Sequence, residues 1–321
     1  MSLFLAIDGG GTKTECMLAD ERRVLARAST GTVKLMRVSE EEATSRLQTM
    51  LVEVAALAGV SLSEVERTCF GLAGLSNPAV DAWARRAVAA VVGGEIIVCG
   101  DEEIALDAAF AEGPGILVVA GTGSNAIGRT AGGELFGAGG WGPVLGDEGS
   151  GSWIGLEAIR VGLRAQDRLG FGGEPTCLLR EIERHWQLKS LGELVALANH
   201  SARPDFASLA PVVARCAEEG DALACGVLER AGEELAELVS LVFHKMAAAV
   251  RGEAAGIGVA FTGSVLNHIA RVRAAMVARL AVSLPNARIR DASVDPLEGA
   301  LWRARRDGAM GIPPLGVSSK R

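Results

Sequence analysis

The feature that most constrains the fold is a pair of similar openings, each an apolar run that ends in a glycine-rich turn before a second β-type run. The first opening is Phe4–Asp8, which leads through Gly9-Gly10-Gly11 into Thr14–Ala19. The second is Ile116–Ala120, which leads into Gly121-Thr122-Gly123. Such runs joined by short glycine turns predict β-hairpins, so the chain is expected to repeat one α/β unit.

Alternating strand and helix patterns follow each opening, and this order predicts mixed sheets with helices on both faces. The units are expected over residues 1–112 and 113–321. For the first unit the remaining predicted elements are strands at Val24–Ala28, Thr68–Leu72 and Glu95–Cys99 and helices at Ser39–Gly59, Pro78–Val92 and Asp101–Phe110. For the second they are strands at Ser124–Arg129, Glu134–Ala138, Gly258–Thr262 and Ala287–Asp291, a largely helical stretch over Ser150–Val250 broken near Gly170–Pro175 and Arg203, and helices at His268–Leu284 and Pro296–Arg306.

Composition excludes several classes of protein. The formal net charge of −7, with 8 Phe, 5 Trp and no Tyr, argues against a nucleic-acid binder, which needs a basic face and aromatic stacking platforms. The six cysteines form no C-x-x-C pair and predict reduced thiols in a cytoplasmic protein. No signal peptide or membrane span is expected. The 41 glycines, well above the usual share of roughly 7%, must serve local backbone roles.

The first glycine turn has the composition of a phosphate-binding loop. Gly10 and Gly11 let the backbone approach an anion, and Thr12, Lys13 and Thr14 add donors. Asp8, at the end of the strand, is placed to hold Mg²⁺ through water. The segment is neither a Walker A loop nor a Rossmann turn, because the spacing is wrong and no helix follows. The structural alternative is a plain hairpin.

The second turn repeats this pattern with Gly121, Thr122, Gly123 and Ser124. Two such loops could hold the phosphates of a nucleoside triphosphate from both sides. Gly263 and Ser264 follow a later strand and precede a helix, a turn that can seat an adenosine against backbone amides.

A third cluster, Gly137–Gly142, fits G-x-G-x-x-G formally, but no helix begins at its last glycine and Pro143 follows. We interpret it as a sugar-binding loop in which Trp141 shapes the pocket and Asp147 accepts hydroxyl hydrogen bonds. Alternatively, Asp147 is the N-cap of the next helix.

Asp101, directly after the strand Glu95–Cys99, is the candidate general base. A carboxylate at the carboxyl end of a strand can accept a hydroxyl proton while a phosphoryl group is attacked. The alternative is again an N-cap. The four histidines lie outside every glycine cluster and are not expected to bind metal.

The order of these motifs resembles the N-acetylglucosamine kinase group of the BadF/BadG/BcrA/BcrD ATPase family, within the actin, hexokinase and Hsp70 superfamily. The resemblance implies two RNase H-like (actin-like ATPase) domains, with mixed five-stranded sheets flanked by helices and a cleft between the domains. It also implies ATP and Mg²⁺ as cofactors, an amino sugar as substrate, and a homodimer.

Carried over residue by residue, the resemblance makes Asp101 the base for the sugar 6-hydroxyl. It assigns the sugar to Asp147, Asn125 and the backbone of Gly140, Trp141 and Gly142. Lys34 replaces the asparagine that related kinases tend to have after the third strand. A cation there could meet the carboxylate of N-acetylmuramate; alternatively it is a solvated surface lysine.

The sequence therefore predicts ATP-dependent phosphorylation of the 6-hydroxyl of N-acetylglucosamine or a close amino sugar, with N-acetylmuramate as a further candidate. The alternatives are a glucosamine kinase, a non-kinase ATPase activator of the same family, or a sugar sensor. The chain lacks the paired, glycine-flanked cysteines of the iron–sulfur activators and the Cys-rich motif of zinc-binding sugar kinases.

Overall fold

The protein divides into two compact units in the computed structural model. The structure describes residues 2–72, 74–75, 77–169, 176–202, 204–250, 257–290 and 292–306. The first unit contains residues up to Gly113 together with the stretch that begins at Val294, and the second is Pro114–Ser293. Helix α11 (Pro296–Arg305) therefore belongs to the first unit, although it lies within the range 113–321 expected for the second.

The first unit is a five-stranded sheet in the order β3-β2-β1-β4-β5. Strands β1, β2 and β3 form an antiparallel meander, whereas β4 and β5 run parallel to β1. The strands are β1 (Leu3–Gly9), β2 (Lys13–Ala19), β3 (Val24–Gly31), β4 (Val65–Leu72) and β5 (Glu95–Cys99). The helices are α1 (Glu40–Ala58), the 3₁₀ turn η1 (Leu62–Glu64), α2 (Pro78–Ala89), α3 (Asp101–Phe110) and α11.

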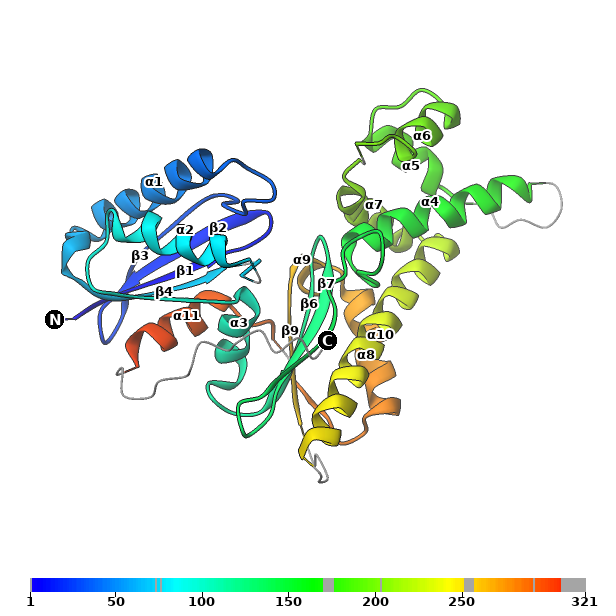
Figure 1. Ribbon diagram of the computed structural model, residues 1–321. Helices are drawn as coiled ribbons and strands as arrows, with labels where there is room; N and C mark the ends of the chain where they lie inside the picture. Colours follow the sequence, from blue (N-terminus) through cyan, green and yellow to red (C-terminus); the bar gives the residue numbers. More distant parts are fainter. Residues whose placement is uncertain are drawn as a thin grey trace. The chain divides into compact units, whose positions relative to one another are not determined.

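Helices α1 and α2 cover one face of this sheet, and α3 and α11 cover the other (Figure 1). The alternation of side chains along β1 explains why both faces are apolar. Leu5 and Ile7 point into the core under α1 and α2, and Phe4 and Ala6 point into the core under α3 and α11. Leu47, Leu51 and Val54 of α1 are buried in this core, whereas Leu57 is 63% exposed near the helix end.

The second unit repeats this topology with the strand order β10-β9-β6-β7-β8. Strands β6, β7 and β8 form the meander, and β9 and β10 run parallel to β6. The strands are β6 (Gly115–Ala120), β7 (Ser124–Arg129), β8 (Leu135–Gly139), β9 (Gly258–Thr262) and β10 (Arg288–Ile289). The duplicated α/β unit with mixed five-stranded sheets is thereby confirmed.

The helices of the second unit are mostly inserted between β8 and β9. They are α4 (Gly151–Asp167), α5 (Leu178–His185), α6 (Leu191–Ala198), the 3₁₀ turn η2 (Phe206–Leu209), α7 (Ala210–Glu218), α8 (Ala222–Val250), α9 (Ser264–His268) and α10 (Ala270–Ser283). The long helix α8 packs on the sheet and lies alongside α10 (Figure 1). Ile116, Val118 and Ala120 of β6 join its core.

Two expectations for this unit differ from the structure. The helix expected over His268–Leu284 corresponds to α10, which begins only at Ala270, because Ile269 leaves the helical conformation (φ −107°, ψ 86°) and separates it from the short helix α9. The expected strand Ala287–Asp291 is only two residues long in β10, and Asp291 lies outside the described residues. The expected breaks at Gly170–Pro175 and Arg203 also lie outside them, apart from Pro204.

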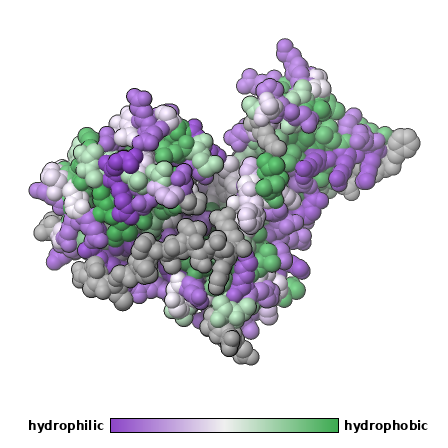
Figure 2. All heavy atoms as spheres, in the orientation of Figure 1, coloured by the Kyte–Doolittle hydropathy of each residue, from purple (hydrophilic) through white to green (hydrophobic). Residues whose placement is uncertain are grey.

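Hydrophilic and apolar side chains are interspersed on the face shown in Figure 2. Among the helices that the structure describes, none combines the length and the apolar character needed to cross a bilayer.

Candidate active site

Asp8 and Asp101 lie at one edge of the first sheet. β1, β4 and β5 are parallel neighbours, so their carboxyl ends meet at the same edge. Asp8 is the penultimate residue of β1, and Asp101 comes two residues after the end of β5. Burial, and after it the negative charge of Asp101, raises the pKa of Asp8 to about 7. The protein thus brings together two carboxylates whose charges it does not fully neutralise.

Asp101 is the first residue of α3, and Gly100 is the N-cap. The N-cap interpretation of Asp101 is therefore wrong. Its Oδ1 instead accepts a hydrogen bond from the Glu102 amide at 3.1 Å. Burial raises the pKa of Asp101, and this amide and the charge of Lys34 partly oppose the rise. A carboxylate with a raised pKa is a better proton acceptor than an ordinary aspartate.

Lys34 is held near Asp101 by ties between two turns. The Thr32 hydroxyl donates to the Gly10 carbonyl at 3.0 Å, and the Val33 amide donates to Thr14 Oγ1 at 3.2 Å. The segment after β3 is therefore fixed against the glycine turn between β1 and β2. Lys34 follows directly and contributes its charge to the environment of Asp101.

The residues of the first glycine turn differ in what they can offer a ligand. Thr12 and Lys13 are exposed, and Lys13 Nζ forms an ion pair with Glu15 at 2.8 Å. Thr14 is fully buried, and its hydroxyl oxygen already accepts the Val33 amide. Gly11, Thr12 and Lys13 are thus accessible to an anion, whereas Thr14 positions the Lys34 segment.

The second unit brings two of the predicted turns together. Because β6 and β9 are parallel neighbours, Gly121 after β6 lies beside Gly263 and Ser264 after β9. Gly263 has φ 99°, and a Cβ there would lie 2.4 Å from the Ala120 carbonyl oxygen. Only glycine fits, because both the positive φ and the close approach exclude a side chain.

Helix α4 supports the Gly121 turn from behind. The Gly151 amide donates to the Gly121 carbonyl at 2.8 Å, and the Ser152 hydroxyl donates to the Thr122 carbonyl at 2.7 Å. The Ser124 hydroxyl donates inward to the Glu148 carbonyl at 2.7 Å. These bonds fix the turn, and Thr122 and Gly123 remain partly exposed.

Asp147 joins the glycine cluster around residues 137–142 to the Gly121 turn. Its Oδ1 accepts the Gly142 amide at 3.2 Å, and its Oδ2 would lie 2.8 Å from a Cβ on Gly123. Ser150, not Asp147, is the N-cap of α4, since the Ser150 hydroxyl accepts the Trp153 amide at 3.1 Å. The N-cap interpretation of Asp147 is therefore also wrong.

The other predicted sugar residues surround Asp147. Asn125 pairs with Gly139 across β7 and β8, and a Cβ on Gly140 would lie 3.4 Å from the Asn125 Cβ. The Gly140 amide donates to the Ser124 carbonyl at 2.9 Å. Trp141 is 54% exposed beside this group. The second unit thus gathers Asn125, Gly140, Gly142 and Asp147 with a phosphate-loop candidate.

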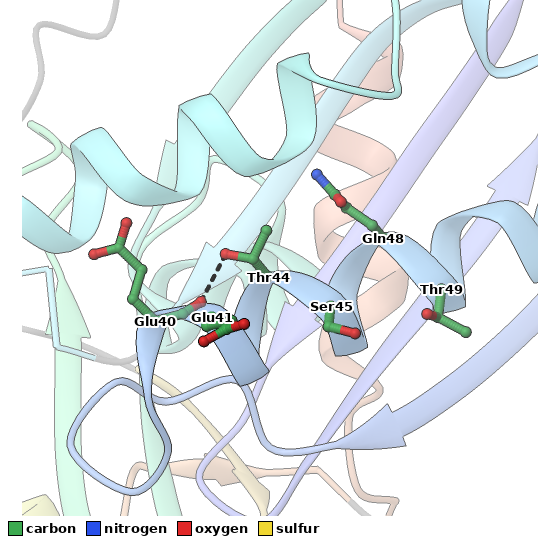
Figure 3. Close-up of a pocket in the computed structure, with 6 residues that line it drawn as sticks. All are labelled: Glu40, Glu41, Thr44, Ser45, Gln48 and Thr49. Carbon is green, nitrogen blue, oxygen red and sulfur yellow. Dashed lines mark hydrogen bonds between the residues drawn. The ribbon is translucent and has the colours of Figure 1, made fainter.

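A separate hollow lies along α1 and contains none of these residues. It is lined by Glu40, Glu41, Thr44, Ser45, Gln48 and Thr49 (Figure 3). Several of these side chains already have structural partners. Thr44 bonds the Glu40 carbonyl at 2.7 Å and Trp83 Nε1 at 2.9 Å, and Gln48 donates to the Ala87 carbonyl at 3.2 Å. The bonds to Trp83 and Ala87 hold α1 against α2.

Reasoning from the sequence missed two residues that position the first unit's site. Thr32 ties the Lys34 segment to Gly10, and Glu103 accepts the Gly100 amide at 3.0 Å. Glu103 has a sequence signal, because a glutamate three residues after the N-cap is typical of a capping box. Thr32 has no comparable signal. Within the described residues, no group of three or more His, Cys, Asp and Glu side chains could by itself hold a metal ion.

The topology and the strand-end sites define a class of protein. Two RNase H-like units, each an antiparallel meander followed by parallel strands, form the fold of the actin-like ATPases and hexokinases. The chain belongs to the BadF/BadG/BcrA/BcrD ATPase family, which it matches over residues 5–304.

Three known proteins show the extent of the similarity. An N-acetylmuramic acid/N-acetylglucosamine kinase of Clostridium acetobutylicum is 34% identical over 239 residues, which is 73% of this chain and 77% of the relative. An N-acetyl-D-glucosamine kinase of Dictyostelium discoideum is 26% identical over 313 residues, 93% of this chain and 96% of the relative. A crystal structure from Chromobacterium violaceum, 24% identical, covers 94% of this chain and 98% of its own, with a TM-score of 0.71.

Proposed function

We propose that the protein is an ATP-dependent kinase that phosphorylates the 6-hydroxyl of N-acetylglucosamine or a close amino sugar. The relatives named as amino-sugar kinases support the substrate class. The observation that carries the chemistry is the position of Asp101, a half-buried carboxylate of raised pKa beside Asp8 and Lys34.

In the proposed reaction, the Asp101 carboxylate accepts the proton of the sugar 6-hydroxyl. The hydroxyl oxygen forms a bond to the γ-phosphorus, and the bond from that phosphorus to the bridging oxygen breaks in line, leaving ADP. We assign the phosphates to Gly10–Thr14 and Gly121–Ser124, with exposed Thr12 as the best-placed hydroxyl of the first turn. Gly263 and Ser264 are assigned to the adenosine.

The sugar is assigned to Asn125, Gly140, Trp141, Gly142 and Asp147. Their arrangement supports this role because Asp147 is fixed by the Gly142 amide and presents a carboxylate beside Gly123. A rigid acceptor can orient sugar hydroxyls with little loss of conformational freedom.

Mg²⁺ belongs to the proposal as the partner of ATP. Asp8 fits a magnesium ligand, because its carboxylate lies beside Asp101 and lacks enough positive charge nearby to hold its pKa at the usual value. Mg²⁺ commonly takes one or two carboxylates, phosphate oxygens and water. When bound, it would neutralise charge on the phosphates. Asp8 would hold it through water.

N-acetylmuramate is proposed as a second substrate through Lys34. The test compares turnover of N-acetylmuramate and N-acetylglucosamine in wild type and Lys34→Ala. We expect the variant to lose turnover of N-acetylmuramate selectively, because only that sugar carries a carboxylate. Equal loss of turnover on both sugars would show that Lys34 acts only through the charge it presents to Asp101. Absence of N-acetylmuramate turnover by wild type would reject this substrate. Arg37→Ala, which removes an exposed cation three residues further along the same segment, is the matched control.

The alternatives are separated by one assay of ADP release with and without a panel of sugars. Release that depends on N-acetylglucosamine supports the proposed kinase, and release that depends only on glucosamine supports a glucosamine kinase. Sugar-independent hydrolysis would support an ATPase activator, and nucleotide binding without hydrolysis a sensor. We also propose a cytoplasmic homodimer, on the family resemblance; light scattering after size-exclusion chromatography tests the oligomeric state.

A further inference from the structure

A buried arginine of the last helix contacts the helix that begins with Asp101. Arg303 of α11 donates from Nε to Asp107 Oδ2 at 2.7 Å, and its Nη1 lies 3.3 Å from Glu103 Oε2. The Arg303 side chain is 12% exposed, and that of Asp107 is 1% exposed. One guanidinium therefore neutralises two acids on the inner side of α3.

Glu103 connects this ion pair to the start of α3. While its Oε2 faces Arg303, its Oε1 accepts the Gly100 amide at 3.0 Å. Gly100 is the residue immediately before Asp101, and its carbonyl accepts the Glu103 amide at 3.1 Å. The orientation of Glu103 thus determines whether Gly100 is hydrogen-bonded at both its amide and its carbonyl.

Helix α11 reaches α3 more closely than side chains normally allow. A Cβ on Gly299 would lie 1.8 Å from the Ile104 carbonyl oxygen, so α11 packs directly on the backbone of α3. This contact places Arg303 within reach of Glu103 and Asp107. The helix has other anchors, since Arg67 donates to the Ala304 carbonyl at 3.0 Å and Arg305 donates to the Asp20 carbonyl at 3.1 Å.

We propose that Arg303 is a positioning residue for the reaction: it holds Glu103, which holds the Gly100 amide and thereby the backbone that carries Asp101. The inference rests on the proposed role of Asp101 as the base. Without the guanidinium, Glu103 and Asp107 repel each other, and Glu103 turns toward solvent, where its charge is hydrated. The Gly100 amide then loses its acceptor, and Asp101 samples orientations that do not accept the proton.

The test uses the full-length enzyme, four single variants and one double variant. Arg303→Met removes the charge and keeps most of the apolar stem, and Arg303→Lys keeps the charge without the fork that reaches both acids. Glu103→Gln retains an oxygen for the Gly100 amide and weakens the bond to Arg303. Arg27→Met is the matched control, because Arg27 also pairs with α11, at Asp295 and Glu298, but at exposed positions.

We expect Arg303→Met to lower kcat by between about 10-fold and 100-fold, with KM for ATP and sugar changed less than about twofold, because misplacing a reacting group affects turnover more than ground-state binding. Arg303→Lys should recover part of kcat. The double variant Arg303→Met/Glu103→Gln should be no slower than Arg303→Met, since both substitutions act through one relay. Arg27→Met should leave kcat unchanged.

Amide hydrogen exchange of residues 100–104 separates this inference from the proposed function. Faster exchange in Arg303→Met together with a lower kcat supports the relay. Unchanged exchange in Arg303→Met overturns it whatever the activity, and faster exchange with wild-type kcat shows that Arg303 is only structural. A wild-type protein that transfers no phosphoryl group to any amino sugar overturns the proposed function instead. Additive losses in the double variant also overturn the relay.

Discussion

The surroundings of Asp8 oppose the negative charge of its carboxylate. Its pKa in the folded protein is about 7, against an ordinary value of 3.8. The folded state therefore binds a proton more tightly than the unfolded state, so stability from this group is full below about pH 4 and is lost as the pH rises to 7. The position is costly to the free protein at neutral pH, which is typical of a site prepared for a cation.

The Asp8→Asn variant should therefore be more stable than wild type above pH 7 and equally stable near pH 4. The full shift sets an upper bound of about 4 kcal/mol at pH 8. Urea denaturation at both pH values, without nucleotide or metal, measures the difference. Asp20→Asn is the opposite control, because backbone amides of Arg22 and Arg23 lower the pKa of Asp20. A variant no more stable than wild type at pH 8 would show that the Asp8 charge is already compensated.

The Asp101→Asn variant should lose between about 10²-fold and 10⁴-fold in kcat, the usual contribution of a general base. Asparagine has the same shape and can still accept the Glu102 amide, so sugar and ATP binding should persist. Steady-state kinetics and calorimetric titration of the sugar check the two parts. Near wild-type turnover would remove Asp101 from this role. Glu102→Gln, one residue along the same helix, is the control and should stay active.

The positions of Asp8 and Asp101 in the fold could be predicted, because the strand next to each residue can be recognised from the local sequence. Asp8 follows an apolar run, and Asp101 follows another, so parallel pairing alone places both at one edge. The burial of Thr14 could not be predicted, because it depends on the Val33 amide from a different turn. The N-cap alternatives for Asp101 and Asp147 failed for a similar reason. The N-caps are instead the small residues Gly100 and Ser150. The local sequence does not decide between N-cap candidates that lie within a few residues of one another.

At the scale of elements, the contact between α11 and α3 depends on the absence of a side chain at Gly299. Gly299→Ala should destabilise the protein by roughly 1–3 kcal/mol, because the new Cβ would meet the Ile104 carbonyl and force the helices apart. Gly226→Ala in α8 is the matched control with the opposite sign. It has open space around it and should stabilise by up to about 1 kcal/mol through helix propensity.

Thermal denaturation of both glycine variants measures these effects, and equal shifts of the same sign would contradict the close contact.

The sequence predicted α11 almost to the residue, since its apolar spacing and Pro296 are local signals. Its place on the first sheet was not predictable, because nothing near Gly299 identifies Ile104 as its neighbour. The break between α9 and α10 at Ile269 could not be predicted either, because no glycine or proline marks it in the sequence.

At the scale of the molecule, the first unit is assembled from two distant parts of the chain. Removing residues 294–321 should abolish kinase activity even though every predicted ligand-binding residue remains. Phe4, Ala6, Met17 and Ile104 would lose the cover of α11, at a cost of several kcal/mol. Proteolysis followed by mass spectrometry should show cleavage within residues 1–113 and protection within 114–293. An active truncated chain would contradict this dependence.

The discontinuity of the first unit also sets an order on its synthesis. A ribosome completes the strands β1 to β5 and the Asp101 helix, then makes the whole second unit before the segment from Val294 appears. At about 5–20 residues per second, the part of the sheet face that α11 covers stays exposed for many seconds, because of its two helices only α3 has been made. The second unit is complete once Ser293 has been made, whereas the unit that carries Asp101 is finished last. A nascent chain is therefore expected to be catalytically silent until α11 has docked, and during that interval the exposed part of this face is accessible to chaperones.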